Sequence, residues 1–205
     1  MEEQHHFGKK QRVLDRKNNW SWFVFMADKK IILLDSSYPI NSRNKRIFNY
    51  LEKKYNIMVI TWDRKGETGK HDKNYYVYNK KINYGHKFKK LICLPLYLLY
   101  IDSIIKKLKP DIIIASNWDM LILASMLKLR YKKSFKLIYE NRDMVTSKYK
   151  MVKKILENIE KRALANTDAM ILASRFFKSQ YEKFKKEKII VENKVPSSVS
   201  KYEKE

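Results

Sequence analysis

The sequence predicts an α/β protein: a single domain built on a doubly wound, mostly parallel, Rossmann-like sheet with helices on both faces. From residue 30 onward, short runs rich in β-branched residues alternate with stretches of helical periodicity. This alternation is typical of parallel βαβ units. The chain has 205 residues and is 44% hydrophobic, which is sufficient for one substantial core.

Seven short segments have the composition of strands. Each is rich in apolar or aromatic residues and is bounded by polar ones, as expected for strands buried in a parallel sheet. The segments are residues 30–35, 57–62, 75–79, 111–116, 135–141, 168–174 and 188–193.

Between these segments, apolar residues recur three or four positions apart, which predicts helices with one apolar face directed at the sheet. The recurring residues are Ile47, Leu51 and Tyr55 in one helix, Val152, Ile155, Leu156, Ile159 and Ala163 in another, and Phe177, Tyr181 and Phe184 in a third. Residues 86–110 form a further helix with an apolar middle and basic ends. It is either a core helix kinked at Pro95 or a helix that docks on an anionic membrane.

The chain divides into three parts. Residues 1–28 are a polar and basic extension without sustained periodicity, residues 29–196 are the Rossmann-like domain, and residues 197–205 are a hinge or tail. The extension is a disordered, mobile arm, a surface anchor through Trp20, Trp22 and Phe23, or an upstream extension of the reading frame.

The expected location is the cytoplasm, with at most peripheral contact with the cytoplasmic membrane. The single cysteine, Cys93, excludes a disulfide framework, and the N-terminus lacks the apolar segment of a signal peptide. The longest apolar run, residues 91–101, contains Pro95 and is too short to span a bilayer.

The formal net charge of +23 would attract nucleic acid, anionic lipid or a phosphorylated substrate. The lysine excess reflects either selection for a basic surface or a general compositional bias. A nucleic-acid-binding domain remains an alternative. Against it, the aromatic residues fall at buried positions of the predicted elements, and no helix-turn-helix, RRM or zinc-finger pattern is present.

The composition argues against cofactor and metal chemistry. The chain has 4 Gly, and the loop after the first strand, DSSYPINSRNKR, has none. Dinucleotide and P-loop sites need glycines where the backbone approaches phosphate. His71 and His86 lie in polar connectors without further ligands at metal spacing. We therefore expect no metal and no cofactor.

Ligands of doubly wound sheets bind beyond the carboxyl ends of the strands, near the point where the strand order reverses. The polar residues that follow the predicted strands are therefore the candidates for a site. They lie in residues 35–44, 62–64, 117–119, 140–143 and 174–175. The residues expected to form the site are Ser36, Ser37, Asn41, Arg43, Asn117, Asp119, Glu140, Asn141, Arg142, Asp143 and Ser174.

Arg43 stands near a helix start, together with Lys45 and Arg46, after a cap expected within residues 41–44. Cations at a helix N-terminus oppose the helix dipole. Either an anion binds between them, or they reflect the general abundance of lysine and arginine.

Glu140 and Asp143 could each serve as a general base or pair with Arg142. Because successive strand side chains alternate, Glu140 and Arg142 would share one face, and Asn141 and Asp143 the other. Asp119 either caps the helix that follows it or contacts a ligand.

Three segments carry a family resemblance. They are PDIIIASNWDMLILA (110–124), KLIYENRDMV (136–145), and LENIEKRALANTDAMILASRFFKSQYEKF (156–184) followed by KIIVENKVP (188–196). Their order and spacing resemble the N-terminal Rossmann-like domain of GT-B glycosyltransferases, family 4-like, in the group that contains sucrose and glycan synthases and bacterial polysaccharide enzymes.

The resemblance implies the acceptor-binding half of a nucleotide-sugar-dependent glycosyltransferase in polysaccharide or glycan assembly. In this family the N-terminal domain holds the acceptor and the C-terminal domain holds the nucleotide sugar. The Glu-containing donor motif has no counterpart here, which implies a second polypeptide with the donor domain and a glycan or lipid-linked acceptor. The alternative is an inactive truncated fragment. Exposed apolar surface near Val195 and the strand ends would favour a partner.

The resemblance also assigns roles to the candidates. Arg142 and Asp143 are the expected catalytic residues, and the other candidates are expected to bind substrate. Two features depart from the family pattern. The usual glycines of the first loop are replaced by SSYPINS, and the histidine often found after the fifth strand is absent, with residues 141–143 in its place.

Overall fold

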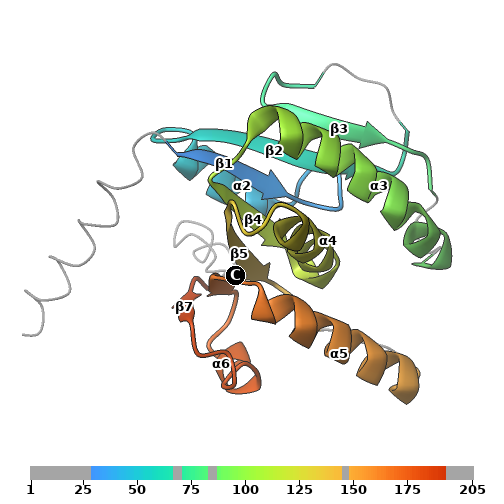
Figure 1. Cartoon of the computed structure of the whole chain (residues 1–205), viewed down its shortest axis with the longest axis vertical. Helices are drawn as coiled ribbons and strands as arrows, with labels where there is room; N and C mark the ends of the chain where they lie inside the picture. The colour runs from blue at the N-terminus through green and yellow to red at the C-terminus, as the bar shows by residue number, and fades with distance from the viewer. Residues whose placement is uncertain (1–28, 67–70, 83–86, 145–147, 193–205) are drawn as a thin grey trace, which may run out of the picture.

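A computed structural model describes residues 29–66, 71–82, 87–144 and 148–192. Within these residues, seven parallel strands form one sheet in the order β3-β2-β1-β4-β5-β6-β7 (Figure 1). The strands are β1 (Lys30–Leu34), β2 (Asn56–Asp63), β3 (Tyr75–Asn79), β4 (Ile112–Ser116), β5 (Lys136–Asn141), β6 (Ala169–Leu172) and β7 (Glu187–Ile190). The predicted α/β Rossmann-like fold is confirmed. The N-terminal extension and the tail with Val195 lie outside the described residues.

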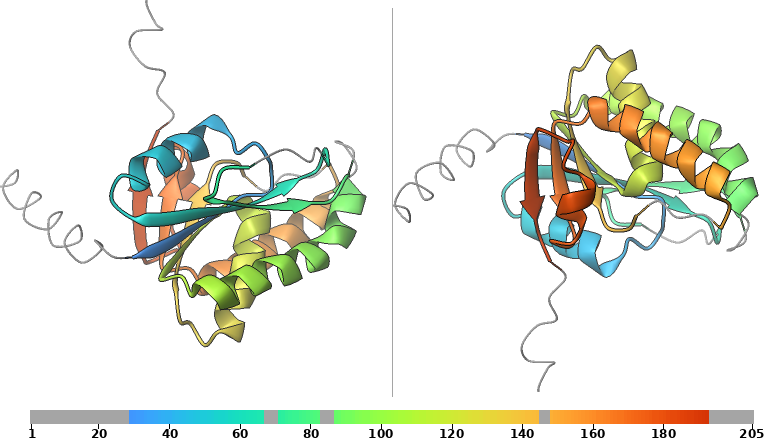
Figure 2. Two further views of the ribbon diagram at one scale, coloured as in Figure 1. Left: turned by 90° about the horizontal axis from the view of Figure 1, so that it is seen from above. Right: turned by 90° about the horizontal axis from the view of Figure 1, so that it is seen from below.

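Five helices connect these strands in the part of the chain that is described. They are α2 (Ser42–Leu51), α3 (Lys87–Leu108), α4 (Asn117–Arg130), α5 (Lys150–Ala165) and α6 (Phe177–Gln180). Figure 2 shows α2 on one face of the sheet and α3, α4 and α5 together on the other. None of the described helices is both long and apolar enough to cross a bilayer.

The unequal covering of the two faces follows from the order of the strands. The chain moves from β1 outward to β2 and β3, then returns through α3 to β4 and continues in the opposite direction. Because crossovers between parallel strands are right-handed, connections that run in opposite directions place their helices on opposite faces. The switch point therefore lies between β1 and β4, and α2 is alone on its face among the described helices.

Each face of the sheet has its own apolar core. The larger one joins Trp62, Met120 and Leu137 with residues of α3, α4 and α5, and the smaller one packs Phe48 of α2 on Leu33 and neighbouring strand residues. Strands that are apolar on both faces are expected in a parallel sheet covered from both sides.

The expected orientation of α5 is wrong. Ile155 and Ile159 were expected to face the sheet, but 53% and 37% of their surfaces are exposed. Ala163, which was expected on this face, is buried, but the residue buried beside it is Glu160, and each is 5% exposed. The Glu160 carboxylate accepts hydrogen bonds from two buried tyrosines, and this contact fixes which side of the helix faces inward.

The third predicted helix is shorter than its apolar spacing suggests. α6 ends at Gln180, and the chain continues in tighter turns in which the Phe184 amide donates to the Tyr181 carbonyl (3.0 Å). Tyr181 and Phe184 are nevertheless buried in the larger core, at 5% and 8% exposure. The apolar contacts form as expected, although the backbone has to turn back toward β7 within a few residues.

A buried polar network joins β5, α5 and the segment after α6. The hydroxyls of Tyr139 and Tyr181 each donate to Oε1 of Glu160 at 2.9 Å. The amide nitrogen of Asn141 donates to both hydroxyl oxygens, at 2.9 and 2.8 Å. Burial raises the pKa of Glu160 above its ordinary value of 4.5, while the two tyrosine hydroxyls lower it.

We expect Glu160→Gln to gain stability relative to the wild type as the pH rises. A raised pKa means that the folded state retains a proton that the unfolded state loses, so the wild-type free energy of unfolding falls as the pH rises above about 4.5. Gln does not titrate and still offers an acceptor to the tyrosines. Urea unfolding from about pH 4 to about pH 8 measures the difference. Glu157→Gln, on the exposed side of α5, is the control, and a difference that stays constant with pH would contradict the expectation.

Candidate functional site

Polar side chains form one row across four neighbouring strands at the carboxyl edge of the sheet. The pairs Leu34–Ile60, Leu34–Ala115 and Ser116–Glu140 fix the register of these strands. One position beyond Leu34, the row on the α2 face consists of Thr61, Asp35, Ser116 and Glu140. The row below it on that face is entirely apolar and consists of Val59, Leu33, Ile114 and Ile138. The strands therefore change from core to site within two residues, at the switch point.

Asp35, which is fully buried, is the central acceptor of this row. Its Oδ1 accepts from the backbone nitrogen of Ser37 (3.2 Å) and from the Ser37 hydroxyl (3.1 Å). Its Oδ2 accepts from the side-chain amides of Asn41 (3.1 Å) and Asn44. The Asn44 amide also donates to the Ser116 hydroxyl at 2.8 Å. These bonds hold the loop after β1 against β4.

Asn41 is the N-cap of α2. Its Oδ1 accepts from the backbone nitrogens of Arg43 and Asn44, each at 3.0 Å. Asn is among the best N-cap residues because its short side chain satisfies donors of the first turn. The Asn41 side chain thus caps α2 through its oxygen and donates to the Asp35 carboxylate through its nitrogen.

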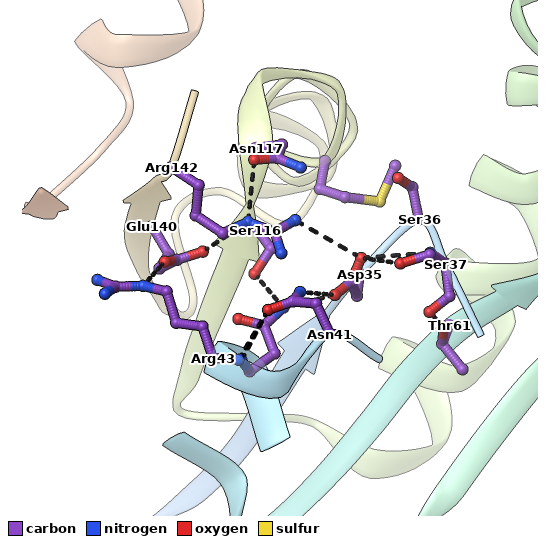
Figure 3. Close-up of polar contacts among 12 residues, drawn as sticks. Asp35, Ser36, Ser37, Asn41, Arg43, Thr61, Ser116, Asn117, Glu140 and Arg142 are labelled. Carbon is purple, nitrogen blue, oxygen red and sulfur yellow. Dashed lines mark hydrogen bonds and ion pairs between the residues drawn. The ribbon is translucent and has the colours of Figure 1, made fainter. Parts of the chain in front are cut away.

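Glu140 is buried between two arginines (Figure 3). Its Oε1 accepts from Nε of Arg43 at 2.5 Å, and its Oε2 lies 3.4 Å from Nε of Arg142. Burial raises the pKa of the Glu140 carboxyl, and the two guanidinium groups act in the opposite direction. Near the start of α2, the anion that pairs with Arg43 is therefore the protein's own Glu140 carboxylate.

Arg43 also contacts the chain at the β7 edge of the sheet. Its Nη1 donates to the carbonyl of Val191, just after β7, at 2.7 Å. The side chain is 5% exposed, so its charge is directed inward. Lys45 and Arg46, by contrast, are on the exposed side of α2.

Arg142 is the cation of this group that reaches solvent, with a side chain 16% exposed. Its Nε donates to Oδ1 of Asn117 at 3.1 Å, and its Nη2 lies 3.9 Å from Oδ1 of Asp35. Asn117 begins α4 with a φ of 68°, a left-handed conformation that asparagine tolerates better than most residues. Figure 3 shows the guanidinium group between Asn117, Glu140 and Asp35, so three elements orient it.

A second polar group lies on the α3 side of the same edge. Nζ of Lys90 forms an ion pair with Asp119 at 2.5 Å and donates to the Ser36 hydroxyl at 3.3 Å. The hydroxyl of Tyr97, on the same helix, donates to the Asp35 carbonyl at 2.8 Å. α3 thereby joins the loop after β1 to the first turn of α4.

Three predicted site residues lie apart from these contacts. Asn141 points to the opposite face, into the Tyr139 network, as the alternation along the strand predicts. Asp143 is exposed beyond the end of β5. The Ser174 hydroxyl accepts from the backbone nitrogen of Phe176 at 3.2 Å, within the turn before α6.

Several members of the site were missing from the sequence-based candidates. They are Thr61, Lys90 and Ser116, whereas Asp35 and Asn44 lie in the candidate segment 35–44 but were given no contact with substrate. Continuing the two-residue alternation beyond the apolar row would have placed the strand members on the α2 face. Lys90 gives no such signal, because its position depends on how α3 packs across the sheet.

The arrangement offers one oriented, partly exposed guanidinium group beside hydroxyl and amide groups at the switch edge. A guanidinium group binds phosphate or carboxylate oxygens through two parallel hydrogen bonds. The buried carboxylates are engaged within the protein and orient this cation.

Comparisons with solved structures show the fold at low sequence identity. A sucrose-phosphate synthase from Thermosynechococcus elongatus matches with a TM-score of 0.56 and 13% identity over 80% of this chain and 48% of that chain. A shorter version of it matches with a TM-score of 0.57 and 14% identity over 80% and 90%. UDP-N-acetylglucosamine 2-epimerase from Rickettsia bellii matches with a TM-score of 0.56 and 12% identity over 78% and 44%.

The lipopolysaccharide outer core galactosyltransferase WaaB matches with a TM-score of 0.55 and 16% identity over 81% of this chain and 46% of that chain. The chain thus spans about half of the length of the longer structures it matches. No curated protein matches it by sequence. The profile of Glycosyltransferase Family 4 matches residues 43–191, which contain most of the sheet and most of the residues of the site. On this evidence, the chain belongs to Glycosyltransferase Family 4.

Proposed function

We propose that this chain is the acceptor-binding half of a nucleotide-sugar-dependent glycosyltransferase that acts in polysaccharide or glycan assembly. Family membership and the fold support a glycosyltransferase-like role. The observation that carries the proposal is Arg142, an oriented and partly exposed cation at the switch point of the sheet. A donor-binding domain would face this edge and complete the cleft.

In the proposed reaction an acceptor hydroxyl attacks the anomeric carbon, the bond to the nucleoside diphosphate breaks, and the diphosphate leaves with the electron pair. Arg142 would stabilise the charge that develops on the phosphate oxygens. Asp143, exposed next to it, would accept the proton of the hydroxyl. Ser36, Ser37, Asn117 and Asp119 would bind acceptor hydroxyls.

Replacing Arg142 or Asp143 by alanine should lower sugar transfer on the order of 100-fold, the effect typical of removing one charge-stabilising or proton-accepting group. The assay combines each purified chain, radiolabelled nucleotide sugars and lipid-linked acceptors with an extract of source cells that lack the native chain. Arg162→Ala, in the last turn of α5, is the control and should transfer as the wild type does.

Wild-type rates in both variants would refute the assignment of the two residues. If the folded wild-type chain supports no transfer with or without the extract, the proposed function is wrong, and the alternative of an inactive fragment is favoured.

Glu140→Gln should lower the free energy of unfolding by about 3 kcal/mol, because it removes the anion that neutralises two largely buried guanidinium groups. It should also lower transfer without contacting substrate, since Arg142 loses one of its anchors. Urea unfolding and the transfer assay measure the two effects. In the control Glu157→Gln, an exposed ion pair with Lys153 is lost, and the expected change is within about 0.5 kcal/mol. Equal stabilities of the two variants would contradict the role given to Glu140.

Peripheral contact with an anionic membrane would suit a lipid-linked acceptor. Ile92, Leu96 and Leu99 form a stripe on α3, with exposed fractions of 60%, 49% and 61%. On α5, Met151 and Ile155 are 78% and 53% exposed. Both helices start near the carboxyl edge of the sheet, where the site lies, and exposed lysines accompany the apolar residues. Apolar side chains flanked by cations favour the interface of an anionic bilayer.

Leu96→Asp with Leu99→Asp should weaken binding to phosphatidylglycerol vesicles at least about tenfold, because two apolar side chains no longer leave water. Cosedimentation with vesicles measures the partition. Tyr50→Asp, on α2 at the opposite face, adds the same kind of charge at a 55% exposed position and should bind as the wild type does. Unchanged binding of the α3 variant would exclude this surface, and equal binding to phosphatidylcholine vesicles would exclude the electrostatic contribution.

A further inference from the structure

A long apolar groove of about 1180 Å³ lies on the α2 face of the sheet. One wall is α2, through Ile47, Tyr50 and Leu51. The floor consists of side chains from β4, β5, β6 and β7, together with Ile31 of β1. These floor residues are Ile112, Ile114, Ile138, Ile171, Ile189 and Val191.

The groove follows from the topology. The right-handed connections after β3 place their helices on the other face, so α2, beside β1 and β2, is the helix that the described residues provide here. The strands beyond it are nevertheless apolar on this side, as strands covered on both faces are. Ile189 and Val191 remain 46% and 45% exposed. An apolar surface of this extent is typical of a face that another segment or molecule covers.

Two parts of the chain outside the described residues are connected to residues at or near the groove lining. The C-terminal part continues from Glu192 at one end of it, and its sequence, NKVPSSVSKYEKE, is mostly polar. The N-terminal part ends immediately before Lys29, two positions from Ile31 in the floor, and contains WSWFVFM at residues 20–26. The N-terminal segment therefore matches the groove in chemistry, and the C-terminal one does not.

The lengths are compatible. Lys29 and Lys30 are held by Asp111, so the reach is counted from residue 29. An extended chain spans about 10 Å from residue 29 to residue 26 and about 20 Å to residue 23. Ile112 and Ile114 pair with Ile31 and Leu33, and Ile138 pairs with Ile114, so these floor residues lie within about 12 Å of Ile31. Ile171 pairs with Glu140, at the level of Asp35, and lies on the order of 20 Å from Ile31. Seven residues cover about 10 Å as a helix and about 23 Å as a strand, so a helix would cover the floor at β4 and β5, and an extended segment would reach further across it.

We propose that residues 20–26 of this chain dock in the groove and cover the α2 face of β4 and β5. Trp20, Trp22, Phe23 and Phe25 would supply the large apolar surfaces that the isoleucine floor lacks. The N-terminal segment then completes the domain as an internal covering element. This role is independent of the proposed glycosyltransferase function.

Disulfide trapping in the full chain tests the proposal. In a Cys93→Ser background, Phe23→Cys is combined with Ile138→Cys in the groove. The matched control combines Phe23→Cys with Leu99→Cys, which is exposed on α3 on the opposite face. After mild oxidation, non-reducing gels and peptide mass spectrometry identify the bonds that form. We expect the groove pair to form an intramolecular bond at least about tenfold faster than the control, because docking raises the effective concentration of the two thiols.

Equal rates for the two pairs, or no bond in the groove pair, would overturn the proposal. A bond that forms only between two chains would overturn it in favour of a second copy as the occupant. A second measurement avoids changes in the groove itself. In the triple variant Trp20→Ser, Trp22→Ser and Phe23→Ser, binding of the dye ANS should rise several-fold as the groove is uncovered. Unchanged dye binding in this variant would also overturn the proposal.

Discussion

The geometry of the site depends on one buried carboxylate. Glu140 binds Arg43 at the start of α2 and Arg142 beyond the end of β5, and Arg43 extends the connection to the carbonyl after β7. A buried ion pair adds little net stability, because desolvation offsets the attraction, but losing one partner is costly. The interaction therefore favours one arrangement of α2, β5 and the chain after β7. In it, the three segments meet at the switch edge and their charged groups contact one another.

Strand alternation allowed part of this arrangement to be predicted. It placed Glu140 and Arg142 on one face and Asn141 on the other, and the helix cap was expected within residues 41–44, where Asn41 provides it. The strands were predicted almost completely, because their β-branched composition and their buried positions have the same cause. Local sequence thus contained both the sheet and the side of it that each strand residue faces.

Long-range packing could not be predicted in the same way. The apolar spacing of α5 suggested that Ile155 faces the sheet, whereas a hydrogen-bonded Glu160 occupies the inner side. Nothing near Glu160 in sequence indicates the two tyrosines that make its burial tolerable. The contact of Lys90 with Asp119 likewise depends on how α3 crosses the sheet. The periodicity of a helix shows that it has an apolar face. Which side of the helix packs on the sheet depends on its tertiary contacts.

The end of β5 carries polar side chains in consecutive residues that point to opposite faces. Tyr139 and Asn141 bond on the α5 side, and Glu140 between them bonds on the α2 side. Before these residues, the strand has the apolar Leu137 on one face and Ile138 on the other, so hydrophobic burial alone would not distinguish the native pairing with β4 from one slipped by a residue. Such a slip would turn Glu140 toward Glu160 and Tyr181 and turn Tyr139 toward Arg43. The alternation of polar groups at this strand end therefore acts as a register lock, which discriminates the native pairing from its nearest competitor during folding.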